Sequence, residues 1–455
     1  MMAPALPHGE IAVLGLARSG TAVAKLLLSG GHQVYASDGG RSAAVVESAD
    51  SLRAMGGHVD VGAHNLERIG RAALVVVSPG IDPAAPPVAA ARQAGVPVLS
   101  EVDIALRFMP RSRVIAVTGT NGKTTTTALI GHLLRGVGAS AVDAGNIGTP
   151  LSEIAILASH PDWIALELSS FQLHDTPSLN PTVGVLTNLA PDHLDRYPTA
   201  SDYYADKARL FANANSASRW VVNADDGRVA SMAEGVTGTH YRFSTQHRAD
   251  GWMDDDGVLQ VLGERLIARS DFSLLGTHNV ANALAAALAV SVADEAFRDS
   301  AARLAMEASL RSFNALAHRL EVVGEIGGVQ WINDSKATNV SSTLVAIEGM
   351  RRPTILLLGG RHKGEPYSRL AAAIGRSVKA VIAYGEAAEK VEEDLGATVT
   401  VERMNADFEA VIERARALAQ PGDAVLMSPA CSSFDMFRNY EERGTRFRQL
   451  VFNKA

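Results

Sequence analysis

The sequence predicts an α/β protein of three domains, each built around a mainly parallel sheet, and three observations lead to this fold class. Short apolar runs alternate with helix-like segments almost throughout the chain, which is typical of βαβ units. The 455 residues are enough for about three domains at roughly 100–200 residues each. Hydrophobic residues make up 47% and charged residues 20%, as in an ordinary globular chain. Breaks in the pattern place the domains at 1–110, 111–315 and 316–455.

The first domain carries a glycine-containing turn directly after its first strand. Gly15-Leu-Ala-Arg-Ser-Gly20 is similar to a dinucleotide-binding turn, although Ala17 stands where the middle glycine is usual. A nucleotide or phosphate site at this strand end is therefore expected, and NAD is an alternative ligand. The loop Ser78-Pro-Gly-Ile81 at a neighbouring strand end lines the same crevice or forms a simple turn. The predicted elements are strands at Ile11–Gly15, Val34–Asp38 and Leu74–Ser78 and a helix at Thr21–Leu28.

The second domain opens with the strongest motif, Thr118-Gly-Thr-Asn-Gly-Lys-Thr-Thr125, between the strand Val114–Thr118 and a helix. Successive backbone N–H groups in such a loop wrap a phosphate, Lys123 adds a positive charge, and the Thr124 hydroxyl can bind Mg²⁺. The spacing departs from the Walker A pattern at Val117, and the alternative is a structural turn. Other elements are predicted at Trp163–Leu168, Val183–Thr187, Trp220–Asn223 and, as a helix, Asn279 to about Val292.

Polar side chains follow the later strands of this domain. Glu167 and His193 lie beyond apolar strands, where a carboxylate and an imidazole suit a divalent metal held against nucleotide phosphates. Alone, His193 equally fits a structural loop histidine, and Lys207 in a helix is read from its residues as a solvated lysine. Asn279 and Asn282 share one helix face, as ligands or as a cap with a buried amide.

The third domain places three polar loops at strand ends of one sheet, an arrangement that suits a small anionic substrate. The first loop brings Asp334, Lys336 and Thr338 together. Arg319 at the second boundary reaches a phosphate or forms a salt bridge between domains. Cys431 has no histidine partner in its motif and is predicted to be a small buried residue. The loops are Asn333–Asn339, Gly359–Gly364 and Ser428–Asp435, after strands predicted at Val329–Asn333, Thr354–Leu358 and Ala424–Met427. A fourth strand is predicted at Ala380–Tyr384.

Composition excludes several classes of protein. A net charge of −7 offers no overall footprint for nucleic acid. One cysteine cannot form an intramolecular disulfide. The longest apolar stretch, Val280–Ala293, is shorter than the ~20 residues of a membrane span, and the N-terminus lacks the features of a signal peptide. A cytoplasmic protein without membrane insertion is expected.

Taken together, these motifs resemble the Mur ligase family over the whole chain, in domain order. The resemblance rests on Thr118–Thr125, Glu167–Gln172, Asp192-His-Leu-Asp195, His278-Asn279, His318-Arg319 and Asn333–Asn339. It implies a Rossmann-like N-terminal domain, a central P-loop ATPase domain and a Rossmann-like C-terminal domain. The strings at 78–81, 333–339 and 428–435 are similar to those of members that add D-glutamate to UDP-N-acetylmuramoyl-L-alanine. Ala17 and Arg361-His362 depart from the family pattern.

The resemblance also implies a reaction and the residues that carry it. ATP would phosphorylate the alanyl carboxylate, and the amine of D-glutamate would attack the acyl phosphate, in cytoplasmic synthesis of a peptidoglycan precursor. Two Mg²⁺ ions and a monomeric enzyme are expected. Catalytic roles fall to Lys123, Lys207, His193 and Lys336, and metal binding to Thr124, Glu167, His193 and a carbamylated Lys207.

The implied ligand contacts fall into three sets. ATP would be bound by Gly119, Thr120, Asn121, Gly122, Lys123, Thr124, Thr125, Asn279, Asn282, Arg319 and Asp334. The uridine-linked substrate would be bound by Leu16, Ala17, Asp38, Ser78, Pro79, Gly80, Asn146 and His193. D-Glutamate would be bound by Thr338, Lys363, Ser433, Phe434 and Tyr440.

Four alternatives remain open. A folate-type polyglutamate ligase shares the phosphate loop but needs no uridine site in an N-terminal domain. A sister ligase that adds a diamino acid would carry an Asp-Asn-Pro acceptor signature, which this sequence lacks. An NAD-dependent dehydrogenase leaves the phosphate loop unexplained, and a nucleotide-binding switch without chemistry leaves the acceptor loops unexplained.

Overall fold

The computed structural model describes residues 6–193, 196–272, 274, 276–314 and 317–453. The chain divides into two compact units. Unit 1 consists of Met1–Leu189, Ser201–Ala268 and Asn282–Leu310, and unit 2 of Ala190–Ala200, Arg269–Ala281 and Arg311–Ala455. Of the sequence motifs, Leu194 and Asp195 lie outside the described residues, and so does the predicted domain boundary at 315–316.

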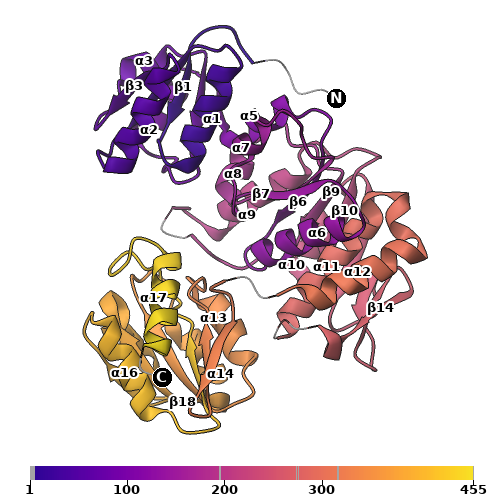
Figure 1. Cartoon of the computed structure of the whole chain (residues 1–455), viewed down its shortest axis with the longest axis vertical. Helices are drawn as coiled ribbons and strands as arrows, with labels where there is room; N and C mark the ends of the chain where they lie inside the picture. Colours follow the sequence, from indigo (N-terminus) through magenta and orange to yellow (C-terminus); the bar gives the residue numbers. More distant parts are fainter. Residues whose placement is uncertain (1–5, 194–195, 273, 275, 315–316, 454–455) are drawn as a thin grey trace. The chain divides into compact units, whose positions relative to one another are not determined.

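The first sheet of unit 1 is wholly parallel and has the strand order β3-β2-β1-β4-β5. Its apolar strands are buried on both faces, which explains their continuous hydrophobic runs. Because β2 and β4 flank β1 on opposite sides, a crevice is expected where the direction of winding changes, at the carboxyl ends of β1 and β4. Figure 1 shows the helices around this sheet. The elements are β1 (Ile11–Leu14), α1 (Arg18–Ser29), β2 (Val34–Asp38), α2 (Ala43–Ala54), β3 (His58–Val61), α3 (Leu66–Gly70), β4 (Leu74–Val77), α4 (Pro86–Gln93), β5 (Val98–Ser100) and α5 (Glu101–Phe108).

The second sheet of unit 1 has nine strands in the order β14-β13-β12-β11-β10-β9-β6-β8-β7. The strands β6 to β12 are parallel neighbours, and β12, β13 and β14 form an antiparallel extension. Its strands are β6 (Arg113–Thr118), β7 (Ala141–Gly145), β8 (Trp163–Glu167), β9 (Val183–Leu186), β10 (Arg219–Asn223), β11 (Thr239–Ser244), β12 (Gly251–Met253), β13 (Val258–Val261) and β14 (Glu264–Ala268).

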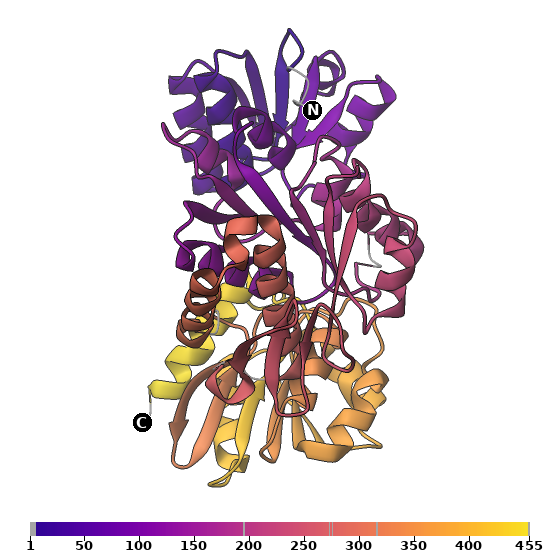
Figure 2. The ribbon, with the colours of Figure 1, turned by 90° about the vertical axis from the view of Figure 1, so that its right-hand side faces the viewer.

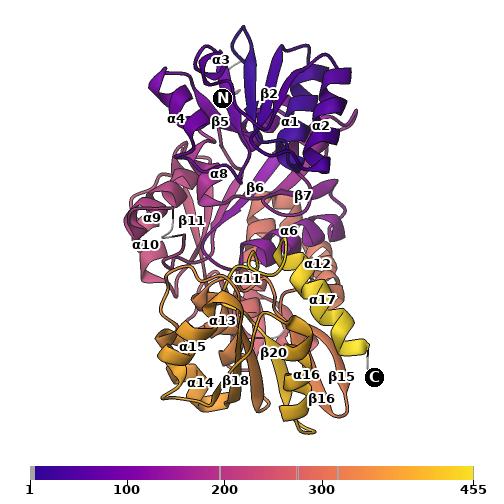
Figure 3. The same ribbon diagram turned by 90° about the vertical axis from the view of Figure 1, so that its left-hand side faces the viewer.

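Helices beside this sheet hold the motif residues of the second predicted domain. The helix α6 lies next to α12 in Figure 3, and the His132 ring nitrogen Nε2 is 3.0 Å from the Ser309 carbonyl oxygen. The Ala-rich α11 is buried from Asn282 to Ala293, so its apolar side chains fill the core. The helices are α6 (Lys123–Gly136), α7 (Leu151–Ala155), α8 (Ser170–His174), α9 (Ala200–Ala208), η1 (Arg209–Phe211), α10 (Gly227–Ala233), η2 (Arg269–Asp271), α11 (Thr277–Ala293), η3 (Glu295–Arg298) and α12 (Ser300–Ser312).

The sheet of unit 2 has the order β15-β16-β20-β17-β18-β19 and is parallel except for β15. Figure 2 shows the late strand β20, in yellow, among the orange strands of the same sheet. The elements are β15 (Glu321–Ile326), β16 (Val329–Asn333), α13 (Val340–Glu348), β17 (Thr354–Gly359), η4 (Tyr367–Leu370), α14 (Ala371–Ser377), β18 (Val378–Tyr384), η5 (Gly385–Ala387), α15 (Ala388–Leu395), β19 (Val401–Arg403), α16 (Phe408–Leu418), β20 (Ala424–Met427) and α17 (Tyr440–Phe452).

The predicted fold class is confirmed: three α/β sheets follow one another along the chain, and most of their strands are parallel. Every strand predicted from an apolar run is present. The strands β12 to β15 were not predicted, and neither were the parallel strands β3, β5, β7, β11 and β19. Exposed or half-buried residues interrupt the apolar run in β12, β14 and β15. The domain boundaries at 110 and 315 stay predictions. No described helix combines the length and the apolar character that a membrane span requires.

Candidate active site

The phosphate-binding motif forms the tight turn between β6 and α6. Gly122 has φ +80°, and a Cβ atom there would lie 2.4 Å from Oδ1 of Asn282, so only glycine fits without a shift. Asn188 holds the backbone of the loop through two hydrogen bonds. Its carbonyl oxygen accepts from Thr120 N at 2.8 Å, and its Oδ1 accepts from Asn121 N at 2.9 Å. The loop thus has a defined backbone path that ends at the amino terminus of α6, where anions are favoured.

The side chains of this loop are positioned as well. Nζ of Lys123 donates to the Thr120 carbonyl at 2.7 Å, which holds the charge over its own loop. Thr124 and Thr125 are buried in the first turn of α6. Gly119 lies at the other end of the loop with φ +142°. Glycines, a lysine and a hydroxyl therefore meet at one helix start, as a nucleoside triphosphate site requires.

Asn282, on helix α11, packs against the phosphate loop. It is buried, and its Oδ1 accepts a hydrogen bond from Thr126 Oγ1 at 3.2 Å. Asn279 is also buried and lies one turn earlier on the same helix face. Asn282 belongs to unit 1 and Asn279 to unit 2.

The expectation of a solvated Lys207, drawn from its own helix alone, is wrong. Lys207 is 1% exposed, and its Nζ donates to the Gly119 carbonyl at 2.6 Å and lies 4.5 Å from the centre of the Tyr203 ring. Tyr203 itself reaches the loop, since its hydroxyl donates to Thr120 Oγ1 at 3.3 Å. Helix α9 therefore packs on the phosphate loop and carries the lysine amine into it.

Glu167 ends β8 as a buried carboxylate with an unused oxygen. Its Oε1 accepts from Asn146 Nδ2 at 2.8 Å, whereas its Oε2 is buried and has no hydrogen-bond partner. A buried carboxylate oxygen without a donor is costly, and a cation removes that cost. Mg²⁺ is commonly bound by one or two carboxylates together with substrate phosphates. The unpartnered oxygen therefore fits a magnesium ion, although no three His, Cys, Asp or Glu side chains gather as a metal site among the described residues.

The turn after β1 and the loop after β4 meet at the carboxyl end of the first sheet. Asp38 at the end of β2 orders the turn, because its Oδ2 accepts from Leu16 N and its Oδ1 from Gly40 N, both at 2.7 Å. Oγ of Ser78 donates to the Gly15 carbonyl at 3.2 Å. Ala17 is the N-cap residue of α1 in an extended conformation, so the turn forms without its middle glycine.

The loop after β4 borders a small pocket shared with helix α8. Ser78, Pro79 and Ile81 line it on one side, and Phe171, Gln172 and Asp175 on the other. Gly80 lies in the same loop. Asn146 joins β7 to β8, since its backbone N–H donates to the Glu167 carbonyl at 3.0 Å.

Gln172 was not assigned a role from the sequence, and the structure makes it a candidate. It forms a capping box with Ser169, whose backbone N–H donates to Gln172 Oε1 at 3.0 Å. Its Nε2 is buried and has no hydrogen-bond partner. The string Glu167–Gln172 was the available signal, but a glutamine three residues after a serine also fits simple capping.

His193 lies in unit 2, whereas Glu167 and Lys207 lie in unit 1. Its backbone has φ +55°. The neighbouring Asp192 holds the segment to the C-terminal sheet, since its Oδ2 accepts from Asn339 Nδ2 at 3.1 Å. A joint metal site of these three residues stays a prediction.

Asp334 is a buried carboxylate at the end of β16. Its Oδ1 accepts from Leu320 N at 3.2 Å and its Oδ2 from the Ser428 hydroxyl at 2.7 Å. Burial raises the pKa of Asp334 to about 7, and the positive charge of Arg319 lowers this pKa only in part. Arg319 and Asp334 lie in the same unit, and their shared contact with ATP stays a prediction.

The three polar loops of unit 2 converge. Arg443 is fully buried and donates from Nη2 to the Ser335 carbonyl at 2.7 Å and to the Cys431 carbonyl at 3.3 Å. Arg361 N donates to the Ser432 carbonyl at 2.9 Å and joins the remaining loop. The sheet therefore brings together loops that are far apart in the sequence.

The residues predicted to bind the acceptor lie on these loops, except Tyr440, which begins α17. Nζ of Lys336 lies 5.1 Å from the centre of the Tyr440 ring, and Thr338 N donates to the Lys336 carbonyl at 2.9 Å. Ser433 is buried, Phe434 is 62% exposed, and Lys363 is half-buried.

Cys431 and the two departures from the family pattern have structural partners. Cys431 is buried as predicted, and burial raises the pKa of its thiol to about 12, so it is not a nucleophile. Arg361 forms an ion pair with Glu386 at 3.0 Å, and Nδ1 of His362 is 2.9 Å from the Tyr367 hydroxyl.

Comparison with known proteins agrees with this geometry. Three family models match in order: the Mur ligase MurD-like N-terminal domain at 9–100, the Mur ligase middle domain at 117–290 and the Mur ligase glutamate ligase domain at 318–431. The chain belongs to the Mur ligase family. The resemblance inferred from the motifs is thereby confirmed.

Individual relatives of this Mur ligase extend the match to the full chain. It is 38% identical over 456 residues to UDP-N-acetylmuramoylalanine--D-glutamate ligase of Pelotomaculum thermopropionicum, covering 98% of this chain and 97% of the relative. It is 39% identical over 446 residues to the ligase of the same name from Geobacter metallireducens, covering 97% of each. The solved UDP-N-acetylmuramate-alanine ligase of Thermotoga maritima has the same fold, with a TM-score of 0.63 and 17% identity over 98% of this chain and all of that one.

Proposed function

We propose that the protein is an ATP-dependent ligase that joins D-glutamate to the alanyl carboxylate of UDP-N-acetylmuramoyl-L-alanine. The observation that carries the proposal is the near-complete match to relatives named for this reaction, at 38% identity over 98% of the chain. The phosphate loop supports the ATP-dependent step, since Lys123, Thr124 and the buried Lys207 meet there in one unit.

The first half of the reaction activates the carboxylate. A carboxylate resists attack by an amine, and phosphorylation by ATP replaces one difficult step with two easier ones. The γ-phosphate would lie over Gly119–Thr125, where Lys123 offsets the charge that develops during transfer. Asn279, Asn282, Arg319 and Asp334 complete the proposed ATP contacts.

Magnesium belongs to the proposal as two ions, held by Thr124, Glu167, His193 and Lys207. When bound, Mg²⁺ neutralises phosphate charge and fixes phosphate geometry. The free Oε2 of Glu167 supports this assignment. An ammonium at Lys207 would repel the ion, so we propose that its neutral amine adds CO₂, losing one proton and gaining a carboxylate. The carbamate keeps one N–H, which can still donate to the Gly119 carbonyl.

The second half of the reaction delivers the amine. Lys336 would lie near the acyl phosphate, and Thr338, Lys363, Ser433, Phe434 and Tyr440 would hold D-glutamate through its two carboxylates. The convergence of their loops around Arg443 supports a pocket for a small anion. Attack by the amine, followed by loss of phosphate, gives the amide.

The uridine-linked substrate would occupy the crevice of the first sheet. Leu16, Ala17, Asp38 and the Ser78–Gly80 segment would hold the nucleotide, and Asn146 and His193 the muramoyl part. The orphaned Nε2 of Gln172 adds a donor beside Ser78 and Pro79. The proposal includes a monomeric enzyme. Both nucleotide substrates belong to the cytoplasm, which fits a cytoplasmic enzyme of cell-wall synthesis.

One assay tests this proposal: release of phosphate from ATP, with each acceptor offered beside UDP-N-acetylmuramoyl-L-alanine. Turnover should require the uridine substrate and D-glutamate together. Equal turnover with L-glutamate or meso-diaminopimelate would refute the acceptor assignment. Turnover with a folate acceptor would favour the folate-type polyglutamate ligase. ATP hydrolysis at the same rate with and without an acceptor would favour the nucleotide-binding switch.

A further inference from the structure

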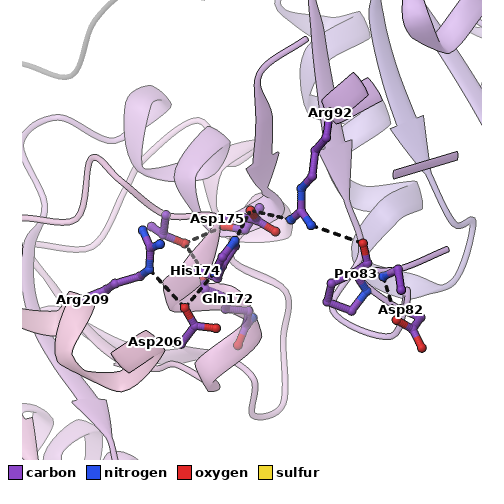
Figure 4. A network of polar contacts seen from close by, with 11 residues as sticks. Asp82, Pro83, Arg92, Gln172, His174, Asp175, Asp206 and Arg209 are labelled. Atoms are coloured by element: carbon purple, nitrogen blue, oxygen red, sulfur yellow. Dashed lines mark hydrogen bonds and ion pairs between the residues drawn. The ribbon is translucent and has the colours of Figure 1, made fainter. Parts of the chain in front are cut away.

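Helix α9 is held from two sides near its end. Lys207 points into the phosphate loop, where its Nζ contacts the Gly119 carbonyl at 2.6 Å. Consecutive helix residues are turned by about 100°, so the preceding Asp206 can face elsewhere, and it meets helix α8. Nδ1 of His174 lies 2.7 Å from Asp206 Oδ1. Nε of Arg209 donates to the same oxygen at 3.1 Å. Figure 4 shows both contacts on Asp206.

The identity of the acceptor fixes the tautomer of His174. A carboxylate oxygen only accepts, so Nδ1 of the ring must carry the proton in this contact. The ring therefore acts as a donor to Asp206, and its Nε2 faces a second carboxylate, Asp175, at 3.9 Å. An aliphatic side chain at position 174 could not replace this contact, whereas an asparagine amide, whose nitrogen occupies nearly the same place as Nδ1, could.

The two helices joined by this pair carry the residues proposed to hold magnesium. Helix α8 begins at Ser170, three residues after Glu167 at the end of β8. Helix α9 ends one residue after Lys207. The His174–Asp206 contact therefore ties the element that follows Glu167 to the element that carries Lys207.

The contact continues toward the loop after β4. Nη2 of Arg92 on α4 is 3.6 Å from Asp175 Oδ1, and Nη1 of the same side chain donates to the Pro83 carbonyl at 3.2 Å. Figure 4 shows Arg92 between the two elements. Pro83 lies five residues beyond Ser78, in the segment proposed to bind the uridine-linked substrate.

This network is too exposed to be a major source of stability. The side chains of His174 and Arg92 are each 38% exposed, and ion pairs of that exposure contribute little to folding. Turnover is more sensitive than stability to such contacts, because a displacement of about 1 Å in a reacting group can reduce turnover by about 10²-fold. Loss of the network should therefore affect chemistry more than folding.

We propose that His174 and Asp206 are positioning residues that hold Lys207 at the phosphate loop in the place where it serves as a magnesium ligand. The proposal rests on the proposed function of Lys207. It adds that a histidine remote from the reacting atoms sets the magnesium requirement and the stability of the carbamate.

The test compares His174→Ala with His174→Asn in the full chain. The Ala variant should need about 10-fold more Mg²⁺ for half-maximal phosphate release and should lose most of the ¹³C carbamate resonance formed with ¹³C-bicarbonate. The Asn variant should restore both, since its amide can donate to Asp206. His240→Ala is the matched control: Nε2 of His240 is 2.8 Å from the Val236 carbonyl in the same unit, and its loss should change neither measurement.

The outcomes distinguish the proposed role of Lys207 from the proposed positioning role of His174 and Asp206. A carbamate resonance that is present in the unmodified protein and absent in Lys207→Ala would support the role of Lys207. Without such a resonance, the role of Lys207 is refuted and this proposal is refuted with it. If the resonance is present and His174→Ala leaves it and the Mg²⁺ requirement unchanged, only the positioning proposal is overturned. Equal losses in His174→Ala and His174→Asn also overturn it, since the hydrogen bond would then be irrelevant. Should His174→Ala fail to fold, Asp206→Ser decides by the same two measurements.

Discussion

Nζ of Lys207 donates a hydrogen bond to the carbonyl of Gly119 at 2.6 Å, although 88 residues separate them in the sequence. The contact places a buried amine at the first glycine of the phosphate loop. A lysine that looks solvated from its helix is thereby placed at the phosphate loop. The effects expected of substitutions at Lys123 and Lys207 both depend on this loop.

Replacing Lys123 by alanine should reduce ATP-dependent phosphate release by at least about 10²-fold, because one positioned donor to a transferring group is worth that much. Far-ultraviolet circular dichroism should show an unchanged fold, since the hydrogen bond from Nζ to the Thr120 carbonyl stays within the loop itself. Lys390→Ala, which removes an exposed lysine paired with Asp394, is the control. Near-normal turnover of Lys123→Ala would refute the phosphate-loop role.

Replacing Lys207 by arginine should nearly abolish activity despite the conserved charge, because a guanidinium cannot form a carbamate. Lys207→Ala should be equally inactive but partly restored by added formate or acetate, which can occupy the vacated space as carboxylates. Turnover measured with and without these anions, on protein shown to be folded, is the test. Normal activity of the Arg variant would leave Glu167 and His193 to hold the metal alone.

Gly20 should not tolerate a side chain. A Cβ atom there would lie 1.8 Å from the Gly15 carbonyl oxygen and 2.5 Å from Oγ of Ser78, so Gly20→Ala must displace the turn of the first sheet. We expect a loss of about 3 kcal/mol in stability and weaker binding of the uridine substrate. Gly227→Ala is the control, since a Cβ there meets nothing within 4 Å. Equal unfolding midpoints for the two variants would contradict the close packing of this turn.

Glu101 should make stability depend on pH. Burial raises the pKa of Glu101 to about 7, while its Oε1 accepts from Ser152 N at 2.5 Å and its Oε2 is buried without a partner. Because the folded-state pKa is above the ordinary value near 4.5, the protonated group stabilises the fold fully below about pH 4.5, and this contribution is lost as the pH rises to about 7.

Glu101→Gln isolates this effect, since the amide keeps the acceptor oxygen and cannot titrate. Between pH 5 and pH 8 the free energy of unfolding of the unmodified protein should fall by about 2 kcal/mol relative to the variant. Urea denaturation of both proteins at each pH measures the difference. Parallel pH profiles would show that Glu101 stays ionised in the folded protein.

The sequence by itself determined the fold class and the position of the phosphate loop. Strands buried on both faces must be continuous apolar runs. The apolar run Val114–Thr118 therefore predicts a strand, and Gly119-Thr-Asn-Gly-Lys123 directly after it predicts the turn. Such local signals are readable because the physical requirement acts within one element. The motifs are specific enough that their residues alone indicate the Mur ligase family.

Only the tertiary structure decided which side chains are buried and which carboxylates lack a partner. Lys207, the unused oxygen of Glu167 and the His174–Asp206 contact depend on packing between elements that are remote in sequence. The edge strands of the three sheets were missed for the same reason, since edge strands take their pairing from neighbours and not from their own hydrophobicity. A residue's burial is a property of the surfaces that meet around it, and no window of sequence contains both surfaces.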